Sequence, residues 1–245
     1  RGDDALKGIS VSVRAGELVG IAGVDGNGQR ELFQALIGTR RPTAGELRFM
    51  GEDWLGAPTS DRLARGLRVV PEDRFAEGMV AEWSLVDNAG LGLQRQDPFR
   101  AGSLRAVSTW KQAAERIATR FGTKHAGVGQ RIGALSGGNQ QRFVAGRALE
   151  NSPSLILAFQ PVRGLDIDGA RQLYEGIRKR CREGAAALVV SFDLDELLEQ
   201  CDRIVVLNRG VLQEPGQGKE RDRLEIGRLM VATPTLRDEL VKHGF

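Results

Sequence analysis

Short apolar runs rich in β-branched residues recur along the chain, separated by segments whose apolar residues repeat at helical spacing. Strands that alternate with helices in this way fold into a mainly parallel sheet with helices packed on it. Two further runs alternate apolar with other residues near glycines, which predicts a small antiparallel layer at one edge. We therefore expect an α/β fold. The core runs are Leu18–Ala22, Leu155–Ala158, Ala187–Ser191 and Ile204–Leu207, and the alternating runs are Ile9–Val13 and Leu47–Met50.

A change of periodicity divides the chain. Strand-like runs stop between about Leu85 and Gln130, and Trp110–Phe121 carries its apolar residues at helical spacing. This change predicts a helical subdomain at residues 85–151, inserted into an α/β core with its β-layer at residues 1–84 and 152–215. A polar tail, residues 216–245, contains one amphipathic stretch at Leu224–Met230 and a weaker one near its end. We expect one domain over residues 1–245, with this insertion.

The composition is that of an ordinary soluble globular protein, with 41% apolar and 27% charged residues. The 35 basic and 32 acidic side chains are mixed along the chain, so we expect no nucleic-acid partner. Cys181 and Cys201 lack the spacing of a metal site, which favours two inert thiols in a reducing compartment over a disulfide.

The sequence contains no apolar run of the roughly 18–20 residues that a membrane helix needs. The first ten residues are too polar for a secretory signal. Any work at a membrane is therefore expected to go through a partner. The abrupt, strand-like start suggests a piece of a longer polypeptide.

The most informative stretch, Leu135–Arg142, reads LSGGNQQR and opens a helix expected to run to about Asn151. Gly137 and Gly138 let the backbone approach an anion closely, and a helix start offers unpaired N–H groups and a positive dipole end. The alternative is an ordinary helix capped by Ser136 after a flexible turn. A strand and Gly164–Leu165–Asp166 follow about 20 residues later, which favours the anion-binding interpretation.

LSGGNQQ resembles the signature motif of ABC ATPases, in the form typical of importers of simple sugars and nucleosides. The other family landmarks follow in order over essentially the whole chain. The resemblance implies an ABC ATPase core similar to the P-loop NTPases, with a mainly parallel sheet, an antiparallel β subdomain and the helical insertion. It is most similar to the second half of a tandem ATPase subunit. The landmarks are a phosphate loop at Gly23–Arg30, a Q-loop region at Pro71–Arg74, a second-strand end at Phe159–Pro161, a D-loop at Gly164–Asp166 and a switch position at Phe192.

The phosphate loop departs from the family pattern G-x-x-x-x-G-K-[ST]. Gly23 and Gly28 keep the spacing, but Gln29 replaces the Lys and Arg30 replaces the hydroxyl residue. Losing a charged hydrogen bond to phosphate costs roughly 1.5–3 kcal/mol, or about one to two decades in affinity. We therefore expect weak ATP binding here. The resemblance implies that nucleotide-binding positions are Gly23, Gly26, Asn27, Gly28, Gln29, Arg30 and Glu72.

The remaining family positions for hydrolysis are also degraded. The two protein supports for Mg²⁺ become Arg30 and Phe159, neither of which can ligate a hard cation. Gln160 replaces the carboxylate that polarises the attacking water, and Phe192 replaces the switch histidine. We therefore expect no metal site and no intact catalytic residue in this chain, with ATP and Mg²⁺ both weak at its own site.

Other conspicuous residues have plain structural explanations. His125 and His243 are isolated and are expected on the surface or in the tail. Asp193, Asp195 and Glu196 begin a predicted helix, for which capping and dipole roles suffice. We expect packed indoles and solvated or structural guanidinium groups at Trp54, Trp83, Trp110, Arg131, Arg142 and Arg147.

Three functions remain open. In the first, the chain is half of a dimeric transport motor, and Ser136, Gly137, Gly138 and Gln140 act on an ATP held by a second nucleotide-binding domain, with Asp166 in the D-loop. Its further partners would be membrane-spanning permease subunits and, indirectly, a periplasmic or lipoprotein solute-binding subunit, at the cytoplasmic face of a bacterial inner membrane. The second is a non-hydrolytic regulatory module, and the third is a soluble ABC ATPase of DNA repair or translation. An intact LSGG beside a degraded hydrolysis site favours the first, and the importer-like PEDR and NQQ runs disfavour the third.

Overall fold

A six-stranded sheet forms the centre of the protein, as seen in the computed structural model, which describes residues 5–94, 97–101, 104–150 and 152–232. The strand order is β10-β9-β1-β8-β7-β4, and every neighbouring pair is parallel except β9 and β10. The strands are β1 (Leu18–Ala22), β4 (Leu67–Val70), β7 (Leu155–Phe159), β8 (Ala186–Val190), β9 (Arg203–Asn208) and β10 (Val211–Gln213). The predicted mainly parallel α/β fold is confirmed.

Both faces of the sheet are buried, which explains why its strands are mostly apolar. Along β1, Leu18 and Ala22 belong to one hydrophobic cluster, whereas Val19 and Ile21 belong to the other. The first cluster packs against α4–α8, and the second packs against α1 and Trp54. These helices are α1 (Gln29–Ile37), α4 (Val107–Arg120), α5 (Gly137–Ala148), α6 (Ile167–Arg182), α7 (Leu194–Gln200) and α8 (Arg223–Val231).

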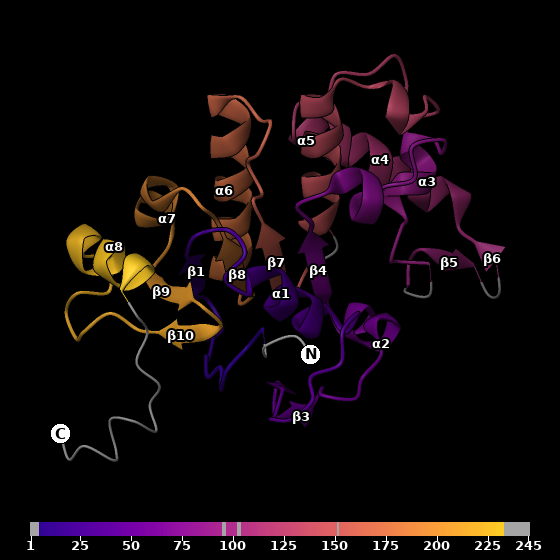
Figure 1. Cartoon of the computed structure of the whole chain (residues 1–245). Helices are drawn as coiled ribbons and strands as arrows, with labels where there is room; N and C mark the ends of the chain where they lie inside the picture. Colours follow the sequence, from indigo (N-terminus) through magenta and orange to yellow (C-terminus); the bar gives the residue numbers. More distant parts are fainter. Residues whose placement is uncertain (1–4, 95–96, 102–103, 151, 233–245) are drawn as a thin grey trace, which may run out of the picture.

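A group of helices lies beside the β4 end of the sheet, while α8 and the β9–β10 hairpin lie at the other end (Figure 1). The group contains α3 (Leu85–Ala89), α4 and α5, as the helical periodicity predicted. The short hairpin of β5 (Arg100–Ala101) and β6 (Leu104–Arg105) was not predicted within it. The exact domain boundaries stay a prediction.

The antiparallel layer is smaller than expected. Ile9–Val13 forms no strand; Ile9 and Val13 pack on the second cluster, and Arg203 binds the Ser12 carbonyl at 2.6 Å. The alternation of apolar residues in this segment therefore reflects packing on one side only, without pairing to another strand. Near Leu47–Met50 only β2 (Arg48–Phe49) pairs with β3 (Glu52–Asp53), because Met50 and Gly51 turn the chain with φ values of 50° and 84°.

One core strand was missed because it contains a charged residue. Arg68 lies within β4, and its Nη1 donates to the carbonyl groups of Leu63 and Leu67 at 2.8 and 2.7 Å. These two hydrogen bonds help to hold the guanidinium inside the protein, and its burial lowers the pKa of Arg68 to about 10. The predicted helix after Leu135 also ends earlier, at Ala148, and Asn151 lies outside the described residues.

The remaining short elements connect these parts. They are α2 (Thr59–Ala64), the π-helical turn η1 (Arg74–Gly78) and the 3₁₀ turn η2 (Ile132–Ala134). The predicted amphipathic stretch Leu224–Met230 lies within α8, which Asp222 caps by accepting from the N–H groups of Leu224 and Glu225. The weaker stretch near the end of the tail lies outside the described residues.

Candidate functional site

The loop between β1 and α1 has the backbone of a phosphate loop, but its own Gln29 fills it. Gly23, Gly26 and Gly28 have φ values of 156°, 85° and 105°, the region that glycine occupies at least cost. The Gln29 side chain is only 2% exposed. Its Oε1 accepts from the Asn27 N–H at 3.1 Å, and its Nε2 donates to the Val24 carbonyl at 3.1 Å. The amide therefore occupies a backbone donor that a phosphate would otherwise use.

The start of the described chain and the β9–β10 turn hold the same loop from outside. Gly210 N–H donates to the Asn27 carbonyl, and Arg209 N–H donates to Asn27 Oδ1 at 2.9 Å. A Cβ on either Gly28 or Gly210 would lie 2.6 Å from the Ala5 carbonyl oxygen. Both glycines are therefore required by the close approach of this segment, which also explains why Gly28 keeps the family spacing.

Arg30 and Phe159 stand at the two positions where the family resemblance places the metal supports, and Phe159 lies in an aromatic cluster. The Phe159 side chain, at the end of β7, is 3% exposed and lies edge-on to Phe33 at 5.4 Å and to Phe192 at 6.0 Å between ring centroids. These residues offer no oxygen ligand, and the described part of the chain contains no cluster of three His, Cys, Asp or Glu side chains that could hold a metal. The residues present therefore do not fit a catalytic Mg²⁺.

An ion-pair network covers this aromatic cluster. Arg30 in α1 pairs with Glu72, which follows β4, and its guanidinium carbon lies 5.9 Å from the Phe159 ring centroid. Arg163 Nη1 lies 3.3 Å from the other Glu72 oxygen. The carboxylate is thus held between two cations, and the Arg30 charge is engaged by Glu72.

Gln160 follows Phe159 directly after the end of β7. Its φ of 48° is unusual for a residue other than glycine, and its N–H donates to the Val190 carbonyl at 2.8 Å. Its Nε2 is buried and has no hydrogen-bond partner among the described residues. An amide here is a weak substitute for a carboxylate general base, because it has no basic oxygen near neutral pH.

Glu196 does more than begin a helix. Asp193 caps α7 as expected, accepting from the N–H groups of Asp195 and Glu196. The Glu196 carboxylate instead accepts hydrogen bonds from the Tyr174 hydroxyl and, at 2.7 Å, from Ser191 Oγ. Burial raises the pKa of Glu196, although these two hydrogen bonds oppose the rise. The capping explanation was therefore incomplete for this residue.

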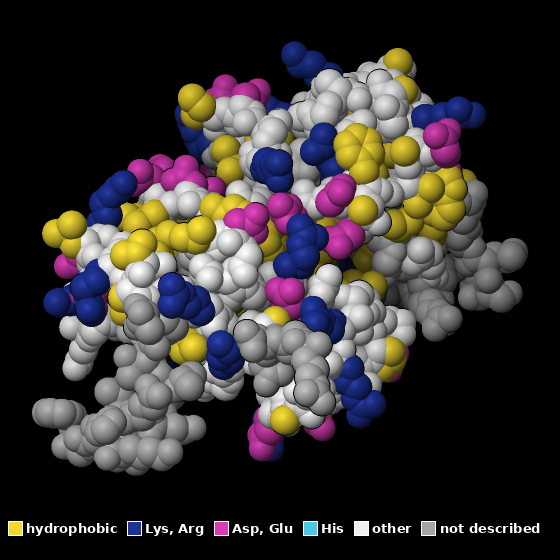
Figure 2. All heavy atoms as spheres, viewed as in Figure 1, with side chains coloured by type: hydrophobic (Ala, Val, Ile, Leu, Met, Phe, Trp, Pro, Cys, Tyr) yellow, Lys and Arg dark blue, Asp and Glu magenta, His cyan; other side chains and the backbone are white. Residues whose placement is uncertain are grey.

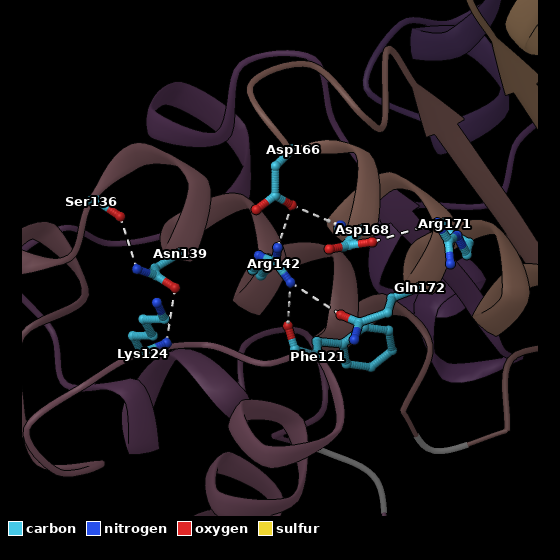
Figure 3. Close-up of polar contacts among 10 residues, drawn as sticks. Phe121, Lys124, Ser136, Asn139, Arg142, Asp166, Asp168, Arg171 and Gln172 are labelled. Atoms are coloured by element: carbon cyan, nitrogen blue, oxygen red, sulfur yellow. Dashed lines mark hydrogen bonds and ion pairs between the residues drawn. The ribbon is translucent and has the colours of Figure 1, made fainter.

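The signature loop presents an exposed helix start. Ser136 and Gly137 are exposed, α5 begins at Gly137, and the Ser136 side chain makes no capping bond to the helix. Ser136 Oγ accepts from Asn139 Nδ2 at 2.8 Å, and Asn139 Oδ1 accepts from the Lys124 N–H at 2.8 Å (Figure 3). The hydroxyl proton of Ser136 stays available for an incoming acceptor.

Gln140 supports this loop from inside. It is 3% exposed, and its Nε2 donates to the Leu135 carbonyl at 3.0 Å. Its Oε1 accepts from Arg74 Nε at 3.2 Å. Gln140 therefore braces the turn that carries Ser136 and does not itself face outward.

A polar cluster joins the signature helix to the start of α6 (Figure 3). Asp166 caps α6 by accepting from the Gly169 N–H at 2.8 Å and also pairs with Arg142 of α5. The Gly169 hydrogen bond and the Arg142 charge hold the pKa of Asp166 below its usual value. Arg142 Nη1 also binds Gln172 Oε1 at 3.0 Å. The predicted D-loop residue thus fixes the signature helix relative to its neighbour.

A cavity of about 480 Å³ lies behind the aromatic cluster. Arg30, Phe33, Glu72 and Phe159 line one part of it, and Leu91–Leu93 of the helical group line another. Residues beside the phosphate loop and residues of the helical group therefore line the same cavity.

The other sequence predictions have mixed outcomes. Trp54 and Trp110 are buried, but Trp83 is 45% exposed, because it lies in a turn after Val80 and not beneath a helix. Arg147 is buried and structural, donating to the carbonyl groups of Asn88 and Gly78 at 3.0 and 2.6 Å. His125 is exposed as expected, and His243 lies outside the described residues.

Both cysteines are buried free thiols. Burial raises the pKa of Cys181 to about 11 and that of Cys201 to about 12, so each is protonated and unreactive near neutral pH.

Comparison with known proteins identifies the family. The model of the ABC transporter family matches residues 6–162. The chain belongs to the ABC transporter family. Within it, the chain is 34% identical over 231 residues to the nucleoside import ATP-binding protein NupA of Lactococcus lactis, covering 94% of this chain and 46% of that protein. It is 37% identical over 219 residues to the ribose import ATP-binding protein RbsA 1 of Mesorhizobium japonicum, covering 89% of this chain and 42% of that protein.

The ABC fold is equally clear from solved structures. The chain superposes on the dimeric ATP-binding cassette MJ0796, solved with ADP and Pi, with a TM-score of 0.73 and 25% identity, covering 84% of this chain and 87% of that one. This ABC chain spans less than half the length of the two import proteins above. Among its described residues, no helix is both long and apolar enough to cross a bilayer. Figure 2 shows basic and acidic side chains interspersed on the face in view.

Proposed function

We propose that this ABC domain is one half of the ATP-driven motor of an importer for a nucleoside or a simple sugar. Its own phosphate loop is non-hydrolytic, and its signature loop acts on an ATP held by a second nucleotide-binding domain. The relatives named above, a nucleoside and a ribose import protein, support the class of solute. Because the chain spans less than half of each, the second domain belongs most simply to the same polypeptide.

One contrast within the domain carries this proposal. The phosphate loop is occupied by its own Gln29, with Phe159 and Phe192 at the positions for metal and switch residues. The signature loop, in contrast, exposes Ser136 and Gly137 at a helix start with no acidic side chain in its first turn. Backbone N–H groups and a hydroxyl placed this way suit an anion arriving from outside the domain.

The remaining parts of the proposal follow from the motor role. ATP and Mg²⁺ would be held mainly by the second domain, and permease subunits would carry the solute across the bacterial inner membrane from a periplasmic or lipoprotein binding subunit. This chain would then lie at the cytoplasmic face. A regulatory module with the same fold is the alternative, and it predicts that the signature loop is dispensable.

Solute uptake into vesicles that contain the assembled transporter tests this. Gly138→Asp places a carboxylate where the incoming phosphate would lie, and Gly138 already has the Gly164 carbonyl oxygen 3.3 Å from a built Cβ. We expect this change to abolish ATP-driven uptake. Gly129→Asp is the matched control, because Gly129 is exposed and its Cβ would meet open space. Full uptake with Gly138→Asp would refute the trans role and favour the regulatory module.

A further inference from the structure

Arg74 lies beside the start of the signature helix, although it belongs to a different segment, the turn that follows β4. A Cβ built on Gly137 would lie 2.8 Å from Arg74 Nη2, so the guanidinium lies directly beside this exposed glycine. Its Nε donates to Gln140 Oε1 at 3.2 Å, and its Cζ lies 4.9 Å from the Phe75 ring centroid. One hydrogen bond and one ring therefore fix the orientation of the guanidinium.

The turn that carries Arg74 is itself well held. Asp73 caps it by accepting from the N–H groups of Phe75 and Ala76 at 2.9 and 3.1 Å. Glu72, the other nearby carboxylate, is occupied by Arg30 and Arg163. Within the described part of the chain, no carboxylate lies within ion-pair distance of Arg74.

The position of the Arg74 charge is electrostatically unfavourable unless an anion binds nearby. The start of a helix carries a partial positive charge, so a cation beside it is unfavourable and an anion is favourable. The first turn of α5 contains no acidic residue to offset this repulsion. A phosphate at Ser136 and Gly137 would relieve it, with both the helix start and the guanidinium attracting the same group.

We propose that Arg74 is a positioning residue for the signature loop, which it braces through Gln140, and that its charge strengthens the binding of the triphosphate presented by the second domain. This inference rests on the proposed trans role of the signature loop. It assigns to the turn after β4 a supporting part in the composite ATP site.

The test measures ATP hydrolysis by the assembled transporter as a function of ATP concentration. We expect Arg74→Gln to raise KM for ATP about tenfold, the effect of losing one charged interaction, with kcat changed less than about twofold. Arg74→Lys should restore KM to within about threefold, because it keeps the charge. Arg131→Gln is the matched control, since Arg131 is a largely exposed arginine just before the same loop, and it should leave KM unchanged.

Three results would overturn the inference or locate its failure. A KM within twofold of the unchanged protein for Arg74→Gln overturns it, and so does an Arg74→Lys protein as impaired as Arg74→Gln, because charge would then have no part. If Arg74→Gln does not fold, Arg74→Met, which keeps the aliphatic stem over Phe75, replaces it with the same expected KM. Normal hydrolysis by Gly138→Asp in the same assay would instead overturn the trans role itself.

Discussion

At the residue scale, the side chains at the phosphate loop bond to the loop itself and to neighbouring residues of the same domain. Gln29 bonds the loop it sits in, and Arg30 bonds Glu72 and covers Phe159. Gln29 and Arg30 both find partners within the domain, so the loop keeps its conformation without needing a ligand to satisfy it. The proposed absence of hydrolysis at this site is therefore compatible with a well-packed structure.

Restoring the lysine alone should recover affinity without catalysis. In the isolated domain, Gln29→Lys frees the Asn27 N–H and adds a cation, so we expect ATP binding to tighten by about one to two decades. Turnover should stay below about 0.1 s⁻¹, as in the unchanged domain, because Phe159 and Gln160 remain. Calorimetric titration and a phosphate-release assay measure the two quantities. Gln94→Lys adds the same charge at an exposed position and should change neither, and turnover well above that limit for Gln29→Lys would show that the site is not degraded.

The half-buried carboxylate of Glu196 should make stability depend on pH. Because burial raises its pKa in the folded protein above the ordinary value of 4.5, folding favours the protonated form. The stability it contributes is full below pH 4.5 and is lost as the pH rises through the folded pKa. Relative to Glu196→Gln, the unchanged protein should lose about 1.4 kcal/mol for each unit by which the pKa is raised.

Urea unfolding at pH 4 and pH 7.5 measures this difference. We expect equal stability for the two proteins at pH 4 and a more stable Glu196→Gln variant at pH 7.5. Glu199→Gln, at an exposed position on the same helix, should behave like the unchanged protein at both values. A Glu196→Gln variant that is less stable at pH 7.5 than at pH 4, relative to the unchanged protein, would contradict the assignment.

At the scale of elements, the helix that follows the phosphate loop is held at its far end by one buried arginine. Arg62 Nη1 donates to the carbonyl groups of Ala35 and Leu36, both at 2.7 Å, in the last turn of α1. Its Nε and Nη2 donate to the carbonyl groups of Ala57 and Trp54 at 3.0 and 2.6 Å. A cation at a helix C-terminus also meets the negative end of the dipole.

Arg62→Met should therefore lower the free energy of unfolding by about 3 kcal/mol, because it leaves buried carbonyl groups without their donor. Denaturant unfolding of the isolated domain measures the change. Arg65→Met, at a half-exposed arginine that pairs with Glu52, should cost less than about 1 kcal/mol. Equal losses for the two variants would show that the buried contacts of Arg62 contribute nothing special.

The sequence predicted those elements whose signal is local. Apolar runs located β1, β7, β8 and β9, since strands buried on both faces are mainly apolar. The same criterion missed β4, because the buried Arg68 meets its partners through backbone carbonyls that no pattern reveals. Alternation at Ile9–Val13 suggested a strand, but packing on one cluster produces the same alternation.

For the candidate site, too, the sequence predicted the features with a local signal and not the contacts that depend on the fold. The glycine spacing and the missing lysine were visible in the sequence, as were the aromatic residues at the metal positions. The hydrogen bonds of the Gln29 side chain to its own loop were not visible there, because that amide could equally have faced solvent. The partners of Glu72 lie 42 and 91 residues away, and only the sheet topology brings Arg30 and Arg163 to one carboxylate.

At the scale of the whole molecule, the carboxyl ends of the parallel strands gather the residues of the proposed non-hydrolytic site at one edge of the sheet, as in other open α/β sheets. Glu72 follows β4, Phe159 ends β7 and Phe192 follows β8. The signature loop belongs instead to the helical group, and the turn with Arg74 reaches it from the end of β4. The domain thus carries a phosphate loop filled by its own Gln29 and, on a different element, an exposed signature loop.

ATP hydrolysis by the assembled transporter, measured with two variants of this domain, tests the central claim most directly. Gln29→Ala alters the closed phosphate loop, and the rate should stay within about twofold of the unchanged transporter. Gly138→Asp alters the open signature loop, and the rate should fall at least about a hundredfold, the scale on which misplaced electrostatics at a reacting phosphate acts. A large loss with Gln29→Ala and a normal rate with Gly138→Asp would contradict the account.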